Sequence, residues 1–192
     1  MKPCTAFIFL CCCLFACSKP QYPLVEIKTD LGMIELEIYE NEAPITAKHF
    51  LANVDKGIFA EACFYRVVHM NNQEGREIKI EVIQGGLFHD SIVDSMPTIR
   101  HERTDQTGIL HKDGVISMAR NLPGSASTEF FICVGDQPQL DAGGLRNPDG
   151  QGFAAFGKVI RGMDVVRKIQ MQKEENQMLV ERIPILSMKR IR

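Results

Sequence analysis

Arg66, Gln84 and Glu129 are the residues whose types and surroundings most suggest chemistry. Each is a polar side chain within a segment rich in β-branched and aromatic residues, and these segments span 64–68, 82–86 and 129–132. Such segments predict strands. A guanidinium is seldom placed on apolar surface without a partner or a task. Taken alone, Arg66 would be interpreted as one partner of a surface ion pair. Together with Gln84 and Glu129 it indicates a binding groove.

Side chains alternate along a strand, and this rule indicates which residues share a face. Val82 shares a face with Gln84, and Phe131 shares a face with Glu129. If the strands adjoin, Arg66 joins Gln84 and Glu129 in a groove floored by Phe131 and Val82. The opposite faces would fill the core with residues such as Ile83, Phe130 and Ile132.

The rest of the chain predicts a mostly β scaffold for this groove. Alternating residues predict a hairpin over 25–39. Helical periodicity predicts two isolated helices, at 43–57 and 162–169. A closing strand is expected at 182–191, with Pro184 near its start or edge. Turn signals at intervals of roughly ten residues favour a closed antiparallel barrel.

The composition is that of one globular domain. The 192 residues have a net charge of −2 and are 45% apolar. A chain of this length can bury a full core. The small negative net charge does not indicate the basic surface that a nucleic-acid-binding protein needs. We expect a monomer without a cofactor or a nucleic-acid partner.

Residues 1–16 are typical of a secretory signal. Lys2 precedes an apolar run at 6–16 that is too short to span a bilayer. The sequence Leu14-Phe15-Ala16-Cys17 resembles a bacterial lipobox, which implies lipidation of Cys17 and attachment to a membrane. Ordinary cleavage, with release of the free protein, is the alternative.

Lipidation would divide the mature chain into two parts. Residues 17–23 would be the lipidated cysteine and a short tether, and residues 24–192 would be the folded domain. The protein would then be anchored in the bacterial cell envelope and face the periplasm. Ser18, directly after Cys17, favours the outer membrane over the inner one by analogy with enteric sorting.

The cysteines and histidines predict no metal site and no disulfide framework. Five of the seven cysteines lie in residues 1–17, which leaves Cys63 and Cys133 in the domain. We expect two buried thiols, and a bridge between them stays open because sequence does not show its geometry. His101 and His111 are too far apart for the usual zinc spacing.

Five sequence blocks follow one another along the domain. They are Phe64-Tyr65-Arg66-Val67-Val68, Ile83-Gln84-Gly85-Gly86, Ile116-Ser117-Met118-Ala119-Arg120, Phe130-Phe131-Ile132-Cys133 and Phe156-Gly157-Lys158-Val159. In this order they resemble the cyclophilin-type peptidyl-prolyl isomerases. The resemblance implies a closed eight-stranded antiparallel β-barrel capped by two α-helices, with the active groove on its outer face.

The resemblance also implies roles for the residues of the groove. Arg66 would be catalytic, donating a hydrogen bond to the proline nitrogen. Phe131, Val82 and Leu140 would hold the proline ring, and Gln84 would bind the peptide backbone. The other residues whose positions imply peptide binding are Glu129, Phe153, Ala119, Arg120 and Asn121.

Three departures from the family pattern concern the polar side of the groove. Glu129 replaces the usual glutamine, so it would bind the peptide only as an acceptor, or else pair with Arg66. Tyr65 replaces the usual histidine and is expected on the strand face opposite Arg66. Phe153 stands where many members have histidine or tyrosine.

Three further departures concern the proline pocket. Glu81 falls where the family usually has an aromatic groove residue, and Gln139 replaces an aromatic residue before Leu140. The stretch between Arg66 and Gln84 is longer than in most members and predicts an extended hairpin loop.

The sequence therefore predicts an isomerase that accelerates X-Pro rotation in proline-containing polypeptides during the folding of cell-envelope proteins. A different class is the alternative, namely a low-turnover module or chaperone that binds proline peptides. Glu81, Glu129 and Gln139 favour that alternative, whereas Arg66, Phe131 and Gln84 favour the enzyme.

Overall fold

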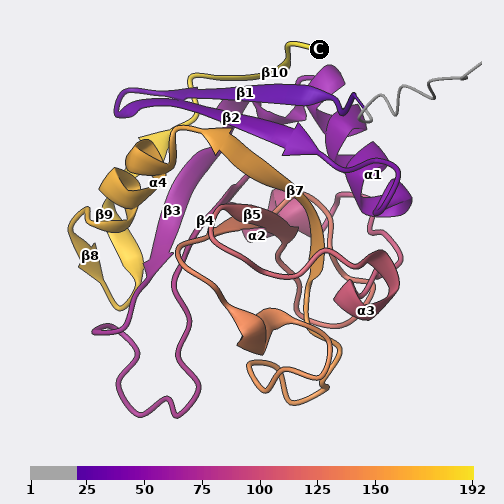
Figure 1. The fold of residues 1–192 in the computed structure, drawn as a ribbon. Helices are drawn as coiled ribbons and strands as arrows, with labels where there is room; N and C mark the ends of the chain where they lie inside the picture. Colours follow the sequence, from indigo (N-terminus) through magenta and orange to yellow (C-terminus); the bar gives the residue numbers. More distant parts are fainter. Residues whose placement is uncertain (1–20) are drawn as a thin grey trace, which may run out of the picture.

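The computed structural model describes residues 21–192, which form a mostly β structure with helices around its sheet (Figure 1). The strands are β1 Leu24–Thr29, β2 Gly32–Ile38, β3 Cys63–Val68, β4 Val82–Gly86, β5 Val115–Met118, β6 Phe130–Cys133, β7 Ala154–Arg161, β8 Glu174–Glu175, β9 Met178–Pro184 and β10 Ser187–Arg190. The helices are α1 Pro44–Asp55, α2 Asp90–Val93, α3 Thr104–Thr107 and α4 Met163–Gln170, with 3₁₀ turns η1 Ile58–Glu61 and η2 Pro138–Leu140. The predicted signal peptide and Cys17 lie outside the described residues.

All ten strands belong to one antiparallel sheet, in the order β10-β1-β2-β7-β5-β6-β4-β3-β9-β8. Within residues 21–192, the two end strands, β10 and β8, do not pair with each other. The predicted closed barrel of eight strands is therefore wrong in strand number and in closure by hydrogen bonds.

The chain itself crosses the gap between the two sides of the sheet. β9 pairs with β3, and β10 pairs with β1. Between them, the Ile185 amide donates to the Ala62 carbonyl at 2.9 Å, and the Leu186 amide donates to the Lys28 carbonyl at 2.8 Å. Pro184 ends β9 because it has no N–H for a further ladder bond. The single closing strand expected from the sequence is thus split into two.

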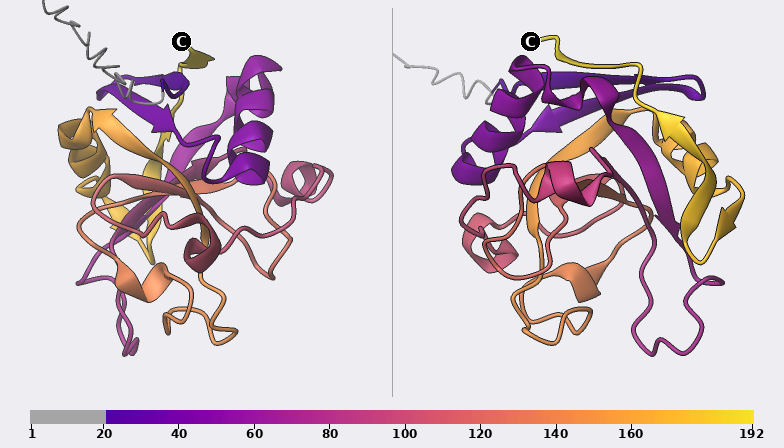
Figure 2. Two further views of the ribbon diagram at one scale, coloured as in Figure 1. Left: turned by 45° about the vertical axis from the view of Figure 1, so that its right-hand side comes forward. Right: turned by 180° about the vertical axis from the view of Figure 1, so that it is seen from behind.

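The two longer helices, α1 and α4, agree with the predicted ranges. They lie on opposite sides of the molecule, α1 in purple and α4 in gold (Figure 2). Pro44 begins α1, where its missing N–H costs nothing. The buried Glu102 carboxylate accepts hydrogen bonds from the amides of Ile45 and Thr46, at 3.1 and 2.7 Å, so it caps this end. Gly57, with a φ of +69°, lies just past the other end, as predicted.

The predicted division of the strand residues between two faces is confirmed. Ile83, Phe130 and Ile132 are fully buried in the main core, where Phe50 of α1 packs near Phe130 with ring centroids 6.0 Å apart. A second, smaller apolar cluster lies on the other face of the sheet. Its members are Val68, Ile80, Val82, Phe131, Cys133 and Leu140, with Ala119 and Phe153 packed against them.

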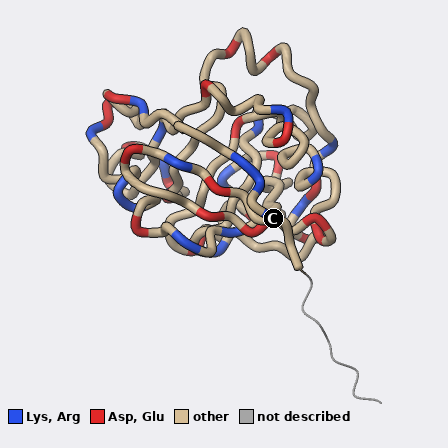
Figure 3. The backbone as a smooth tube through the Cα atoms, turned by 90° about the horizontal axis from the view of Figure 1, so that it is seen from above, with Lys and Arg blue, Asp and Glu red and all other residues tan. Residues whose placement is uncertain are grey.

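Cys63 and Cys133 are both buried and free, so the expectation of two buried thiols is confirmed. Basic and acidic residues are interspersed along the chain in Figure 3, in keeping with the small net charge. In the part of the chain that the structure describes, no helix combines the length and the apolar character needed to cross a bilayer.

Candidate active site

The second apolar cluster forms part of a groove of about 960 Å³. The structure brings together in its lining every groove residue expected from the sequence, although these come from three strands (β3, β4 and β6), the η2 turn and several loops. They are Arg66, Val82, Gln84, Ala119, Arg120, Asn121, Glu129, Phe131, Leu140 and Phe153.

A β-bulge in β3 turns Arg66 toward the groove. Phe64 pairs with Gly85 and Arg66 pairs with Gln84, so Tyr65 is an extra residue with no partner of its own. The bulge reverses the alternation at this point. Phe64 therefore points into the core, where it is fully buried, while the Arg66 side chain reaches Gln84 in the groove.

The Arg66 guanidinium is fixed by two glutamines. Its Nη1 donates to Gln84 Oε1 at 2.8 Å, and its Nη2 and Nε donate to Gln177 Oε1 at 2.5 and 3.2 Å. Burial lowers the pKa of Arg66 from its ordinary value. The group still stays protonated, because arginine does not lose its proton in proteins.

Sequence reasoning missed Gln177, which lies in the turn between β8 and β9. Asn176 and Gln177 both have positive φ, at 53° and 73°, and the Gln177 amide donates to Glu174 Oε2 at 2.6 Å. The Gln177 side chain also donates from Nε2 to the Asn72 carbonyl at 2.9 Å. An Asn-Gln pair can indicate a turn, but no local signal connects it with an arginine 111 residues away.

Tyr65 lies on the same side as Arg66, and the expectation of opposite faces is wrong because of the bulge. The Tyr65 hydroxyl accepts a hydrogen bond from Gln84 Nε2 at 2.7 Å and donates to Glu129 Oε2 at 2.5 Å. Burial, and then the adjacent Glu129 carboxylate, raise the pKa of Tyr65, so this hydroxyl keeps its proton.

Glu129 does not form the ion pair with Arg66 that the sequence suggested as one possibility. Its carboxylate accepts hydrogen bonds from the Tyr65 hydroxyl and, at 2.7 Å, from the Leu87 amide. Burial raises the pKa of Glu129, and these hydrogen bonds oppose the shift. Gly86 makes room for the carboxylate, because a Cβ there would overlap Glu129 Oε1.

The apolar part of the groove is well packed. Val82, Phe131 and Leu140 are 3%, 4% and 0% exposed, and Phe153 meets Phe131 edge to face at 5.2 Å. Sequence reasoning missed Ile80, which is 6% exposed and belongs to the same cluster. Its position two residues before Val82 is the signal that could have found it, because alternate residues share a face.

His111 supports the pocket from behind. Its ring stacks on Phe131 at a centroid distance of 5.9 Å, while its nitrogens contact Asp141 Oδ1 at 2.8 Å and Ser117 Oγ at 3.0 Å. No group of three or more His, Cys, Asp or Glu side chains suited to a metal occurs among residues 21–192. The His111 side chain therefore supports Phe131, with both of its nitrogens in contact with groups of the protein.

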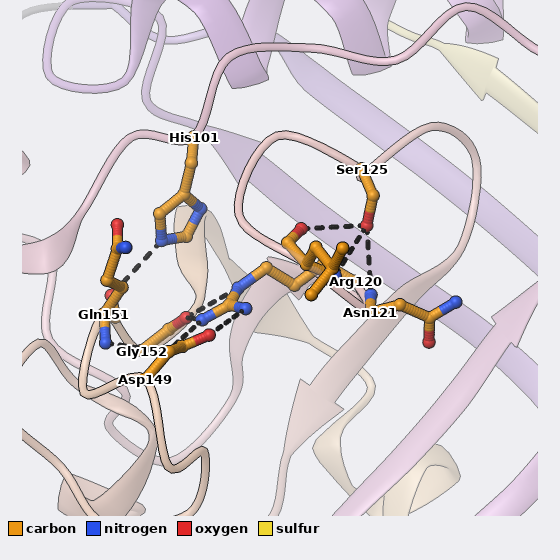
Figure 4. Close-up of polar contacts among 8 residues, drawn as sticks. His101, Arg120, Asn121, Ser125, Asp149, Gln151 and Gly152 are labelled. Carbon is orange, nitrogen blue, oxygen red and sulfur yellow. Dashed lines mark hydrogen bonds and ion pairs between the residues drawn. The ribbon is translucent and has the colours of Figure 1, made fainter.

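Arg120 holds the other rim of the groove (Figure 4). Its Nη1 and Nη2 donate to the Asp149 carboxylate at 2.8 and 3.0 Å, and its Nε donates to the Gly152 carbonyl at 2.9 Å. The hydrogen bond from Arg120 lowers the pKa of Asp149 to about 2. The guanidinium also lies 5.2 Å from the ring centre of Phe153, which connects this rim with the apolar pocket.

The backbone at 119–121 is partly engaged within the protein. The Ala119 amide donates to the Glu129 carbonyl at 2.8 Å, and the Asn121 amide donates to Ser125 Oγ at 3.1 Å (Figure 4). These bonds hold the segment in place. They also mean that Ala119 and Asn121 can engage a peptide through their carbonyls but not through their amides.

Comparisons with known proteins agree on one family. The family model described as cyclophilin type peptidyl-prolyl cis-trans isomerase/CLD matches residues 24–190. The chain is 38% identical over 147 residues to a peptidyl-prolyl cis-trans isomerase of Acinetobacter baylyi, covering 76% of this chain and 71% of that protein. It is 30% identical to peptidyl-prolyl cis-trans isomerase B of Escherichia coli, over 77% and 84% of the two chains.

The fold also matches solved structures. A crystal structure of a cyclophilin type peptidyl-prolyl cis-trans isomerase from Cryptosporidium parvum superposes with a TM-score of 0.70 at 20% identity, over 90% of this chain and 99% of that one. A second structure of that protein, in the presence of the dipeptide Ala-Pro, gives a TM-score of 0.68 at 21% identity, over 88% and 99%.

Proposed function

The chain belongs to the cyclophilin-type peptidyl-prolyl cis-trans isomerase family, and we propose that it carries out this isomerisation through Arg66. The family model and the curated relatives support the activity itself. The part played by Arg66 depends on the chemistry of the X-Pro bond and on the side chains that surround the guanidinium.

Rotation about an X-Pro bond is slow because resonance gives the C–N bond double-bond character, with a barrier of roughly 18–20 kcal/mol. In the twisted state the nitrogen lone pair leaves conjugation with the carbonyl and can accept a hydrogen bond. A guanidinium aimed at that nitrogen therefore lowers the barrier. Its bond to the nitrogen is stronger in the twisted state than in the planar one.

The observation that carries this proposal is the way in which Arg66 is held. A guanidinium has five N–H groups. Within residues 21–192 three of them are used by Gln84 and Gln177, which leaves two for a substrate. Both glutamines hold the cation without neutralising it, so it keeps its full charge at the edge of the apolar pocket.

The other groove residues would place the substrate. Phe131, Val82, Leu140 and Ile80 offer an apolar surface against which a proline ring would pack. The carbonyls at 119–121 would accept hydrogen bonds from the peptide backbone, much as an added strand would form them. A related protein was crystallised in the presence of Ala-Pro, which supports a proline-containing ligand.

We further propose that this isomerase acts on proteins of the cell envelope, anchored through Cys17. The described chain begins beside the C-terminal strand, at the top of Figure 1, whereas the loops that border the groove lie at the bottom. An anchor ahead of residue 21 would thus leave the groove accessible. Replacing Cys17 with Ser should abolish the incorporation of labelled palmitate into the protein, and a variant that still incorporates the label would refute lipidation at Cys17.

The catalytic proposal is tested by a proline-isomerisation assay on the wild-type protein and on Arg66→Ala. Loss of a charged donor from the twisted state should cost about 2–4 kcal/mol, or roughly 30- to 1,000-fold in rate. An Arg66→Ala variant with wild-type turnover would refute the role of Arg66. A wild-type protein that binds proline peptides without turning them over would be a binding module instead.

A further inference from the structure

We propose that the groove contains a second subsite, built by Arg66, Arg76 and Arg146, for an oxyanion carried by the client beside its proline. The inference rests on the proposed function, since it names the class of proline sequence that the same groove prefers. All three arginines line the groove, together with Ile80 and Val82 of the proline pocket.

Two of these arginines come from loops. Arg76 lies in the long loop between β3 and β4, and Arg146 follows η2. Arg146 Nη1 donates to the Ile78 carbonyl at 2.7 Å and to Gln73 Oε1 at 3.1 Å. The Ile78 carbonyl that binds Arg146 is two residues from Ile80, which lines the proline pocket. An anion bound by Arg146 would therefore lie close to the bound proline.

A buried side chain, Gln73, connects the loop that carries Arg76 to the neighbouring backbone. Gln73 is 1% exposed, and its Nε2 donates to the carbonyls of His69 at 2.9 Å and Ile80 at 2.8 Å. Its Oε1 accepts from the Ile80 amide at 3.2 Å, and its carbonyl accepts from the Arg76 amide at 3.2 Å. The backbone that carries Arg76 is therefore already ordered before a client binds, which limits the entropy lost on binding, although the Arg76 side chain itself is exposed.

The three guanidiniums have no acidic partner of their own. In the described part of the chain, no carboxylate lies within 4.0 Å of any of them, although ion pairs form at many other places. Arg120 provides the contrast within the same groove, because Asp149 neutralises it. Like charges that gather without a counter-ion repel one another, and an incoming anion relieves that repulsion.

The pKa values agree with this arrangement. The pKa of Arg146 is lowered by burial and then by the charges of Arg76 and Arg66. The acids that line the groove are Glu129, Asp90 and Asp94, and among residues 21–192 none of them forms an ion pair with the three arginines; Glu129 bonds to Tyr65 and Leu87 instead. The arginine subsite thus stays open to a ligand.

The test compares matched proline peptides that differ by one charge. Glu, Gln or Lys is placed one or two residues before or after the proline, and kcat/KM is measured by a protease-free NMR exchange assay. We expect the best Glu peptide to exceed its Gln counterpart by about 4- to 25-fold, at roughly 2- to 5-fold per loop arginine. The preference should shrink as salt is added, because exposed charges are screened.

Variants assign the preference to the subsite. The double variant Arg76→Gln/Arg146→Gln should lose the Glu-over-Gln preference, and Arg76→Glu should shift it toward the Lys peptide. Lys79→Gln is the matched control, because Lys79 lies in the same loop but does not line the groove. It should keep the wild-type preference.

Equal kcat/KM for Glu and Gln peptides at every position, or a preference that survives the double variant, would overturn the subsite. Phosphoserine peptides distinguish the source of the oxyanion, since a larger gain with phosphoserine than with Glu would assign it to phosphate. If no peptide is turned over, the proposed function fails. The same peptide series measured by equilibrium binding then still decides whether the anion subsite exists.

Discussion

Tyr65 and Arg66 are consecutive in the chain, yet their side chains bond to opposite ends of the same Gln84 amide. Arg66 Nη1 donates to Gln84 Oε1 at 2.8 Å, and Gln84 Nε2 donates to the Tyr65 hydroxyl at 2.7 Å. The hydroxyl in turn donates to Glu129. A continuous chain of hydrogen bonds therefore leads from the guanidinium to the partly buried Glu129 carboxylate, and all its donors point in one direction. Such chains strengthen their members and fix the orientation of each group.

Removing the Tyr65 hydroxyl should weaken both activity and stability. Tyr65→Phe leaves Gln84 Nε2 and the Glu129 carboxylate each without one partner. We expect a loss of about 1–3 kcal/mol in the free energy of unfolding and a roughly 3- to 10-fold fall in kcat/KM. Urea unfolding and the isomerisation assay measure the two effects. Tyr39→Phe is the control, because the Tyr39 hydroxyl forms no side-chain hydrogen bond within residues 21–192. It should change the unfolding free energy and kcat/KM less than Tyr65→Phe does, and equal effects of the two variants would contradict the role of the Tyr65 hydroxyl.

Glu129 should make the free energy of unfolding depend on pH. Because burial raises its folded-state pKa above the unfolded value, the folded protein binds this proton more tightly. The group therefore contributes most stability at low pH, and that contribution is lost as pH rises from the unfolded pKa through the folded one. Relative to wild type, Glu129→Gln should become steadily more stable from pH 4 to pH 7 in urea unfolding. A constant difference across that range would show that burial does not raise this pKa.

Gly86 should tolerate alanine far less well than Gly57 does. Both have positive φ, at +147° and +69°, but an added Cβ overlaps the Glu129 carboxylate in the first case and meets nothing within 4 Å in the second. We expect Gly57→Ala to cost about 1 kcal/mol and Gly86→Ala about 2–4 kcal/mol in unfolding free energy. Equal losses would mean that Glu129 moves aside without cost.

Ile80 rather than Glu81 should determine proline affinity. Ile80 is 6% exposed within the apolar cluster, whereas Glu81 belongs neither to that cluster nor to the groove lining, and its carbonyl accepts a hydrogen bond from the Val134 amide at 2.9 Å. Ile80→Ala should lower kcat/KM by roughly 10- to 100-fold, chiefly through KM, because about 1.5–3 kcal/mol of apolar contact is lost. Glu81→Ala, measured in parallel, should resemble wild type, and the reverse order of effects would refute this assignment.

Much of the groove could be predicted because it depends on alternation along strands. Val82 and Phe131 face the groove, and Ile83 and Phe130 face the core, as a period of two residues requires. The side chain of Tyr65 could not be placed in this way, because one extra residue in β3 changes the face on which the later residues of that strand lie.

The remaining features depend on contacts between distant segments. Gln177 reaches Arg66 across 111 residues, and only the pairing of β9 with β3 brings them together. The sheet likewise stays open because the chain passes from β9, which pairs with β3, to β10, which pairs with β1. Ile185 and Leu186 form this connection. Pro184 indicates that a strand ends there, but not which strand the chain joins next.

The most direct test of the role of Arg66 separates binding from rotation. A peptide titration followed by NMR gives the Kd for wild type and for Arg66→Ala. Exchange measurements at a saturating concentration of protein then give the cis-trans rate of the bound peptide. If the guanidinium acts on the twisted state, the bound rate should fall by at least roughly 30-fold while Kd changes by less than about 3-fold. An unchanged bound rate with a weakened Kd would contradict this account, because Arg66 would then only hold the peptide.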